Sequence, residues 1–139
     1  MCKQDLSLAD LIRGTSVLFS TVLATTERIR QMGFFDESLA PSEDWELMMR
    51  LATARCQMRG LPLQLTHGRV HPQNTVRRPA VVAASGLEAL EKVFSLPGFP
   101  EELLTQHQIA RGFHRARMAA LGSHKTRWTS IEVMVYVTR

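Results

Sequence analysis

Residues 33–52 read GFFDESLAPSEDWELMMRLA, and the second half of this stretch has the pattern of an amphipathic helix. If the helix starts at Ser42, steps of about 100° per residue place Trp45, Met48 and Met49 together on one apolar side. The sequence therefore predicts a helix that packs this side against a hydrophobic core. We expect the two methionines to fill that core rather than to bind a ligand.

The charged residues of the predicted helix divide into two groups. Glu46 and Arg50 lie opposite the apolar side at i,i+4 spacing, which is typical of a solvated ion pair. Glu43 and Asp44 open the helix, and Asp44 falls inside the apolar arc. One interpretation is structural, because Ser42 can cap the helix and carboxylates in the first turn complement its dipole. The other is that Asp44 is a partly buried carboxylate that takes a proton from a substrate hydroxyl.

The segments around this helix have their own local signals. Residues 15–20 (TSVLFS) have the β-branched and aromatic content of a buried strand, and residues 23–32 are expected to form a short helix that stops at Gly33. Downstream, Gly60 and a following proline are expected to break the helix, and alternating leucines at 63–65 favour an extended segment.

The order of the residues in the first stretch resembles the signature of family 2 glycosyltransferases, in which GxFDE precedes an ED pair that opens a helix ending in RL or RLA. Segments 14–37 and 60–74 are similar to the strand, helix and loop that flank this signature, so the resemblance spans about residues 12–78. The matching signature positions are Gly33, Phe35, Asp36, Glu37, Glu43, Asp44, Leu47 and Arg50.

The resemblance implies an α/β fold in which residues 1–78 are the C-terminal, acceptor-side half of a GT-A sandwich without its N-terminal half. Residues 79–122 are expected to form a helical hairpin, because apolar residues recur at helix spacing on both sides of the PGFP break at 97–100. The final segment, 123–139, ends in a β-like pattern. A strand, a disordered tail and the trace of a shifted reading frame all remain open for it.

The resemblance implies the reaction of that family, which is inverting transfer of a sugar from a nucleotide-sugar to an acceptor hydroxyl. Asp44, with Glu43 beside it, would be the catalytic base. A magnesium or manganese ion shared between a DxD motif and His71 would stabilise the diphosphate, and Arg69 would bind a phosphate. No DxD occurs in this chain, so we expect a truncated or split transferase that is inactive alone. For His71 the structural alternative is a loop histidine that hydrogen-bonds to the backbone. For Arg69 it is a salt bridge to a carboxylate such as Asp36.

The acceptor pocket implied by the resemblance would be shaped by Asp36, Glu37, Trp45 and Gly14. A turn role is as plausible for Asp36 and Glu37, and Trp45 can pack in the core instead of stacking on a sugar ring. The competing class of function is a non-catalytic binding or interaction module built on a transferase remnant. Such a remnant is expected to self-associate through an exposed sheet edge.

The composition is that of a folded domain, with 45% hydrophobic and 22% charged residues. Cys2 and Cys56 match neither a disulfide framework nor zinc-ligand spacing, and no apolar run approaches the ~18 residues of a membrane-spanning helix. We therefore expect a cytoplasmic protein, with peripheral contact to the inner membrane face as a further possibility. The net charge of the chain is +4, but the arginines are spread along the sequence without interleaved aromatic residues. Nucleic acid is therefore not expected as a partner. A complete enzyme would take a nucleotide-sugar donor and a glycan or lipid-linked acceptor.

Overall fold

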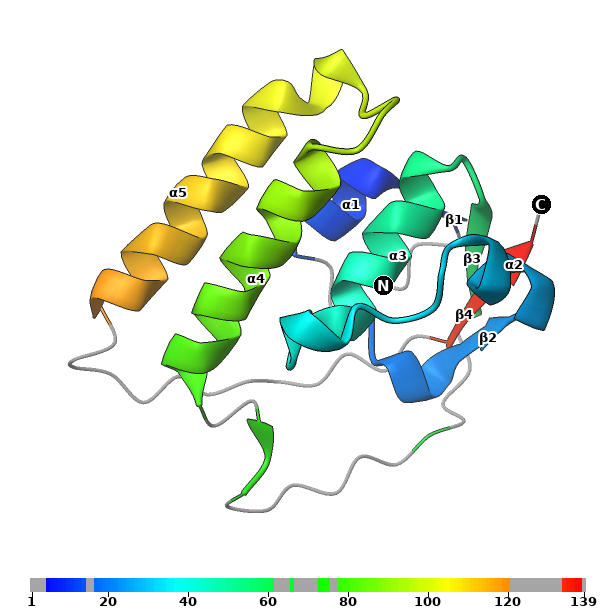
Figure 1. Cartoon of the computed structure of the whole chain (residues 1–139), viewed down its shortest axis with the longest axis horizontal. Helices are drawn as coiled ribbons and strands as arrows, with labels where there is room; N and C mark the ends of the chain where they lie inside the picture. Colours follow the sequence, from blue (N-terminus) through cyan, green and yellow to red (C-terminus); the bar gives the residue numbers. More distant parts are fainter. Residues whose placement is uncertain are drawn as a thin grey trace.

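The structure is a computed structural model that describes residues 5–14, 17–61, 66, 73–75, 78–120 and 134–138. Its fold is mixed α/β, which confirms the predicted class. Figure 1 shows helices α1 and α3 lying between a small sheet and the long pair α4 and α5. The α-helices are α1 (Leu8–Ile12), α2 (Thr26–Gln31), α3 (Glu43–Thr53), α4 (Pro79–Phe94) and α5 (Leu104–Ala120), with short 3-10 turns η1 (Phe19–Thr21), η2 (Glu37–Leu39) and η4 (Glu101–Leu103).

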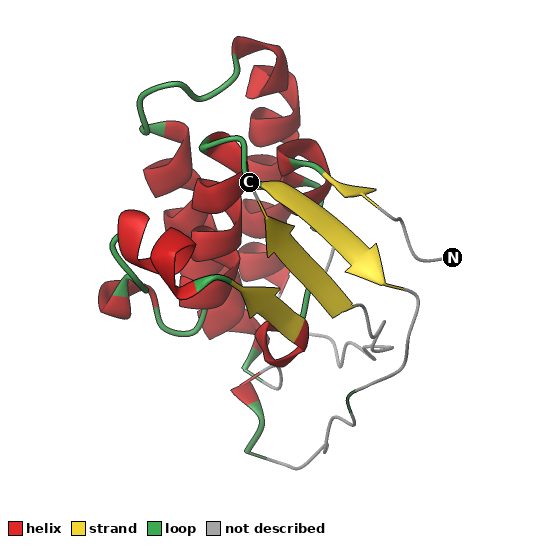
Figure 2. Cartoon of the chain, turned by 90° about the vertical axis from the view of Figure 1, so that its right-hand side faces the viewer, coloured by secondary structure: helices red, strands yellow, loops and turns green. Residues whose placement is uncertain are grey.

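Four strands of the described chain form one sheet in the order β1-β3-β4-β2. Strand β3 pairs antiparallel with β1 and β4, whereas β2 pairs parallel with β4. Figure 2 shows the helices stacked on one face of this sheet. The strands are β1 (Asp5–Leu6), β2 (Val22–Ala24), β3 (Gln57–Leu61) and β4 (Met134–Thr138).

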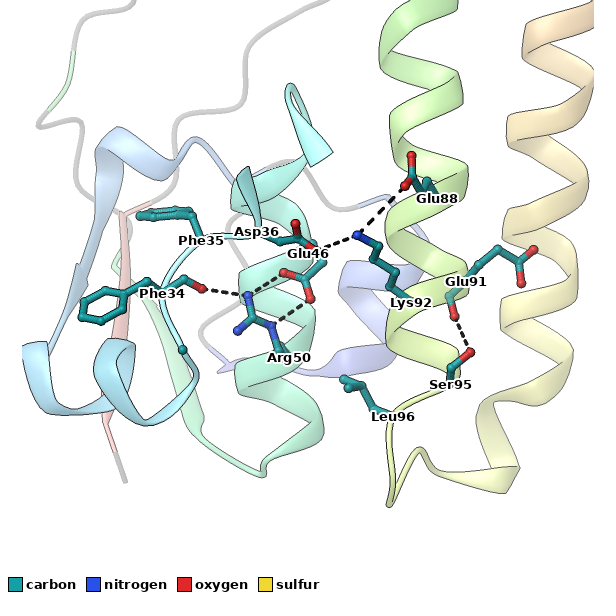
Figure 3. Close-up of a pocket in the computed structure, with 11 residues that line it drawn as sticks. Phe34, Phe35, Asp36, Glu46, Arg50, Glu88, Glu91, Lys92, Ser95 and Leu96 are labelled. Atoms are coloured by element: carbon teal, nitrogen blue, oxygen red, sulfur yellow. Dashed lines mark hydrogen bonds and ion pairs between the residues drawn. The ribbon is translucent and has the colours of Figure 1, made fainter. Parts of the chain in front are cut away.

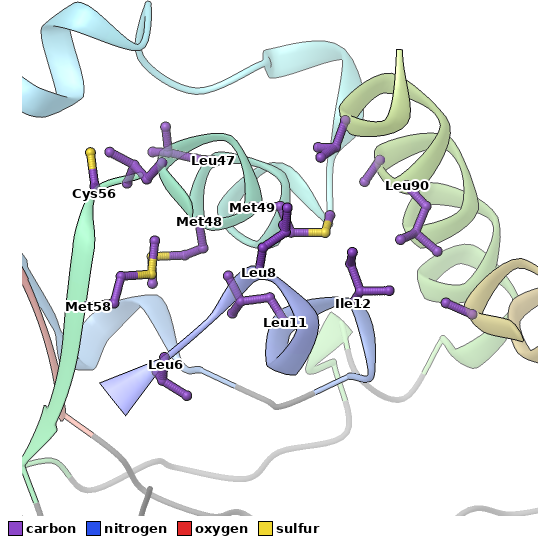
Figure 4. Close-up of a cluster of buried hydrophobic side chains, with 14 of the residues drawn as sticks. Leu6, Leu8, Leu11, Ile12, Leu47, Met48, Met49, Cys56, Met58 and Leu90 are labelled. Atoms are coloured by element: carbon purple, nitrogen blue, oxygen red, sulfur yellow. The ribbon is translucent and has the colours of Figure 1, made fainter. Parts of the chain in front are cut away.

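The hydrophobic core is centred on α3, as its apolar pattern predicts. Met48 is only 2% exposed and Met49 is fully buried, which confirms that the methionine pair fills the core. Burial of a side chain of this size contributes about 1.5–3 kcal/mol, before the entropy cost of ordering it. Figure 4 shows side chains of α1, β3 and α4 packed around the same helix. The largest fully buried hydrophobic side chains are Leu11, Leu39, Leu47, Met48, Met49, Leu51, Leu90 and Val93.

The elements before α3 follow the local sequence signals, but β2 and α2 both begin later than predicted. The strand predicted at 15–20 lies later, at β2, because the chain first makes the 3-10 turn η1, where the Thr21 hydroxyl donates to the Leu18 carbonyl at 2.6 Å. Helix α2 begins after its capping residue Thr25, and the chain leaves it at Gly33, whose φ of +80° suits glycine. The predicted stop at Gly33 is therefore confirmed.

After α3, the chain turns before Gly60 rather than at it. The helix ends at Thr53, and Arg55 adopts a positive φ of 60° before β3 begins. Gly60 thus lies within a strand, and the prediction that it breaks the helix is wrong. The leucines at 63–65 lie outside the described residues.

The C-terminal segments join the same core. Helices α4 and α5 form the predicted hairpin on either side of the PGFP turn, and Leu90, Val93 and Ala110 belong to the buried cluster around α3. The chain on both sides of residue 78 therefore contributes to one core. The β-like ending is a strand, because β4 lies between β3 and β2 with Tyr136 in register with Arg59 and Leu23.

Candidate functional site

The start of α3 holds the two predicted catalytic carboxylates, Glu43 and Asp44. Ser42 occupies the capping position, but its side chain makes no capping hydrogen bond; instead, Asp44 Oδ1 accepts from the Trp45 backbone amide at 2.6 Å. Burial raises the pKa of Asp44 above its ordinary 3.8, and the nearby Glu43 raises it further. Oε2 of Glu43 is buried and has no hydrogen-bond partner among the described residues. The pair is thus partly withdrawn from water, and no described cation forms a salt bridge with it.

Trp45 is positioned as a packing residue. Its indole N–H donates to the Leu11 carbonyl at 3.1 Å, and its ring lies 5.6 Å from the His114 ring of α5. Because the indole donor is already satisfied inside the protein, the contacts favour the core interpretation over stacking on a sugar.

The Glu46–Arg50 pair is not solvated, so that prediction is wrong. The Glu46 side chain is 5% exposed, and its carboxylate receives two bonds from Arg50, at 2.8 Å from Nε and 2.6 Å from Nη2. The same guanidinium donates to the carbonyls of Met32 and Phe34 at the end of α2. The pair is buried because the loop after α2 and helix α4 cover the polar side of α3. Through these hydrogen bonds Arg50 holds the GFFDE loop, residues 33–37, against α3.

Asp36 has a structural partner that the sequence motif does not contain. Its carboxylate accepts from Lys92 of α4 at 2.7 Å and from the Ser38 amide and hydroxyl at 3.0 and 2.6 Å. The hydrogen bond from Lys92, followed by those from Ser38, lowers the pKa of Asp36 to about 2. The Ser38 contacts make Asp36 the cap of η2, so the predicted turn role is present.

A cavity of about 700 Å³ opens between the GFFDE loop, α3 and α4. Figure 3 shows the Arg50–Glu46 and Lys92–Asp36 pairs side by side on its floor. Its lining carries more carboxylates than cations, and both cations already bind carboxylates. The lining residues are Gly33, Phe34, Phe35, Asp36, Glu46, Arg50, Glu88, Glu91, Lys92, Ser95 and Leu96.

The structure brings only part of the predicted site together. Asp36 lines the cavity, whereas Asp44 and Trp45 are not among its lining residues. Glu37 is exposed on η2, and Gly14 turns the chain at the end of α1 with a φ of +89°. Of the four predicted acceptor residues, only Asp36 therefore lines this cavity.

The predicted phosphate and metal ligands, Arg69 and His71, lie outside the described residues. Within the part of the chain that is described, no group of three or more His, Cys, Asp or Glu side chains is placed to hold a metal ion. In the same part, no helix is both long and apolar enough to cross a bilayer.

Two participants in the cavity were missed by the sequence reasoning. Lys92 gave no signal, because it reads as one solvated residue of an amphipathic helix 56 positions from Asp36. Arg50 did give a signal, as the arginine of the RLA element, but its i,i+4 spacing from Glu46 suggested a surface pair.

Comparison with known proteins adds no relative. Neither family models, nor curated proteins, nor solved structures match the chain.

Proposed function

We propose that this chain forms the acceptor side of an inverting glycosyl-transfer site, with Asp44 as its base. The observation that carries the proposal is the raised pKa of Asp44, caused by burial and by the adjacent Glu43. A carboxylate with a raised pKa is a stronger base and accepts a hydroxyl proton more readily. Asp36, with a pKa of about 2, is a weaker base, so the two signature aspartates differ in what they can do.

The chain order supports a partial GT-A sandwich as the framework of this site. Strand β2 is followed by α2, the GFFDE loop, α3 and β3, and both strands belong to one sheet covered by helices. This is the succession that the resemblance implies for the acceptor half. In the proposal, the nucleotide-sugar and the magnesium or manganese ion depend on a donor half with a DxD motif that this sequence does not contain.

The proposed chemistry is a single displacement. The acceptor oxygen forms a bond to the anomeric carbon as the bond from that carbon to the diphosphate oxygen breaks on the opposite face. The acceptor proton passes to the Asp44 carboxylate, and the nucleoside diphosphate leaves with the electron pair. General-base assistance of this kind contributes about 10²–10⁴-fold, and the rest of the rate depends on positioning.

A second candidate function, a non-catalytic binding module, is favoured by the position of the cavity. Its walls come from the GFFDE loop, α3 and α4, and its cations are held in internal ion pairs. A ligand there would lie against Asp36 and Lys92 without contact to a residue placed for catalysis.

An NMR titration of the ¹⁵N-labelled chain separates the two functions. For the acceptor-side role we expect soluble oligosaccharides to shift the amides of Glu43, Asp44 and Trp45, and nucleotide-sugars to leave them unchanged. The conservative variant D44N should weaken that response, and E102Q, which changes an exposed carboxylate of η4, should not. Shifts confined to Asp36 and Lys92, or none with any glycan, would overturn the acceptor role.

A transfer assay tests the same proposal from the other side. The purified chain, mixed with UDP-, GDP- or dTDP-sugars and glycan acceptors, is expected to release no nucleoside diphosphate above the buffer control. Turnover would show that the donor-binding machinery is present in this chain after all.

A further inference from the structure

The cavity between the GFFDE loop, α3 and α4 has the size of a small-molecule site. Its volume of about 700 Å³ falls within the range of roughly 300–1,000 Å³ that such sites occupy. Charged groups from three segments converge on it: Asp36 from the loop, Glu46 and Arg50 from α3, and Glu88 and Lys92 from α4. A cavity of this size with a few convergent polar groups is the ordinary form of a ligand site, and the balance of those groups indicates the class of ligand.

The hydrogen-bond donors of the lining are largely occupied. Arg50 makes four hydrogen bonds, two to Glu46 and two to backbone carbonyls. The Lys92 ammonium donates to Asp36 Oδ2 at 2.7 Å and to Ser38 Oγ at 2.8 Å. A guanidinium has about five N–H donors and an ammonium about three, so little donor capacity is left for a ligand. A phosphate or carboxylate would have to break these internal bonds in order to bind.

The hydrogen-bond acceptors of the lining are in surplus. Oε1 of Glu88 lies 4.0 Å from Lys92 Nζ, which is too long for a hydrogen bond, and the Glu88 side chain is 57% exposed. Each carboxylate offers about four lone-pair sites, so Glu46 and Asp36 also keep acceptor capacity beyond the bonds they receive. The cavity therefore favours a ligand that donates hydrogen bonds.

The charge of the lining points the same way. Lys92 and Arg50 each neutralise one carboxylate of the cavity, and Glu91 is paired with Arg111 of α5. Figure 3 shows Glu88 on the far side of Lys92 from the loop, where it is the carboxylate left in excess. A positively charged ligand would neutralise this excess.

We propose that this cavity binds a small organic ammonium ion, with the ammonium group against Glu88. The ammonium supplies the donors that the lining lacks, and its alkyl body packs on Leu96 and on the methylene stems of Lys92 and Arg50. This ligand class rests on the binding-module function and does not depend on Asp44 as a base. A nucleoside diphosphate is expected not to bind there.

An NMR titration of the ¹⁵N-labelled chain with three ligands of equal chain length tests the chemistry. We expect pentylamine to shift the amides of Glu88, Lys92 and Leu96 in a saturable way, with a Kd in the millimolar range. Pentanol should bind more weakly, and pentanoate and UDP should leave these amides unchanged. The amides of Glu101 and Glu102, which are exposed in η4 and do not line the cavity, report any non-specific attraction of the amine to carboxylates and should not shift.

A pair of carboxylate variants tests the position of the ammonium group. E88Q should weaken pentylamine binding at least threefold, because it removes the excess charge, whereas E102Q should leave the Kd unchanged. Circular dichroism should report folded protein for both, because the altered side chains are exposed. Sodium chloride at about 0.5 M should weaken the binding of the amine and not that of pentanol.

Four results would overturn the proposal: no saturable response to pentylamine, equal affinity for pentanol and pentylamine, tighter binding of pentanoate, or an E88Q variant with unchanged affinity. Equal affinity for pentanol would leave the cavity as a binding site but reject the ammonium ligand. The reporter amides lie in the cavity and not at Asp44, so none of these results bears on the response of Asp44 to glycans.

Discussion

A methyl group at Gly86 tests how tightly α4 and α5 are packed. A Cβ at this position would lie 2.6 Å from Cε1 and 3.0 Å from Nδ1 of His114 on the facing helix. Favourable carbon contacts occur at about 3.5–4.0 Å, so the imidazole ring must move by roughly 1 Å. The ring has little room, because it lies 5.6 Å from the Trp45 ring and 5.9 Å from the Phe113 ring.

The expected size of the effect follows from two opposing terms. Replacing a glycine inside a helix with alanine stabilises by about 0.5–1 kcal/mol. Overpacking of a filled contact costs about 1–3 kcal/mol. G86A should therefore lower stability by about 1 kcal/mol. G112A changes a glycine of α5 with no atom within 4 Å of the new Cβ, so it should raise stability by about 0.5–1 kcal/mol.

Thermal unfolding followed by circular dichroism measures both variants. One kcal/mol corresponds to about 4 °C in Tm for a chain of this size. We expect Tm to fall by about 4 °C in G86A and to rise by about 2–4 °C in G112A. In an H114A background, G86A should become stabilising, because the clash is gone. Equal stabilisation by G86A and G112A in the parent chain would refute the close packing of His114.

Three further predictions concern charged and titratable side chains. The pKa of Asp44 is raised, so its contribution to stability is full below pH 3.8 and is lost as pH rises through the folded-state pKa. The variant D44N, which stays neutral, should therefore raise Tm at pH 7 but not at pH 3. A lower Tm of D44N at pH 7 would favour the helix-dipole role of this carboxylate. R50M leaves the buried Glu46 carboxylate unpaired and should lower the free energy of unfolding, measured in urea, by about 3–5 kcal/mol. R30M, which removes an exposed ion pair, should lower it by less than about 1 kcal/mol. Equal losses in the two variants would contradict the buried ion pair. Burial lowers the pKa of His107 below 6.5, so the unfolded chain binds the proton more readily and stability should fall as pH drops below about 6.5. H107F should flatten this dependence of stability on pH. An unchanged dependence would assign it to other titratable groups.

Sequence reasoning succeeded where structure depends on neighbouring residues. The stop at Gly33 and the break between α4 and α5 follow from left-handed glycine geometry and proline. Helix α3 begins after Ser42 as predicted, although the Ser42 side chain makes no capping hydrogen bond. These signals act within one or two turns of the chain and need no knowledge of the fold.

The errors arise where distant segments meet. Glu46 and Arg50 read as a surface pair, and they are buried because the loop at Met32 and Phe34 lies over them. The β-like pattern of the last segment does not by itself distinguish a strand from a disordered tail; the segment is a strand because it pairs with β3, which lies far back in the sequence. Long-range pairing is set by the whole core, so a local pattern cannot report it.

The two aspartates of the motif differ in their surroundings, and the helical hairpin is part of the reason. Asp36 and Asp44 lie eight positions apart in the chain, yet the pKa of Asp36 falls to about 2 and that of Asp44 rises. The difference comes from surroundings: Lys92 of α4 donates to Asp36, whereas Asp44 faces burial and Glu43. A segment outside the signature therefore fixes Asp36 as an ionised anchor and leaves Asp44 as the stronger base. Removing that anchor with K92M should raise the pKa of Asp36 toward 3.8 and leave Asp44 unchanged, as carboxyl ¹³C NMR titration would measure. A parallel change in Asp44 would mean that the two carboxylates share one electrostatic environment, and the assignment of distinct roles would fail.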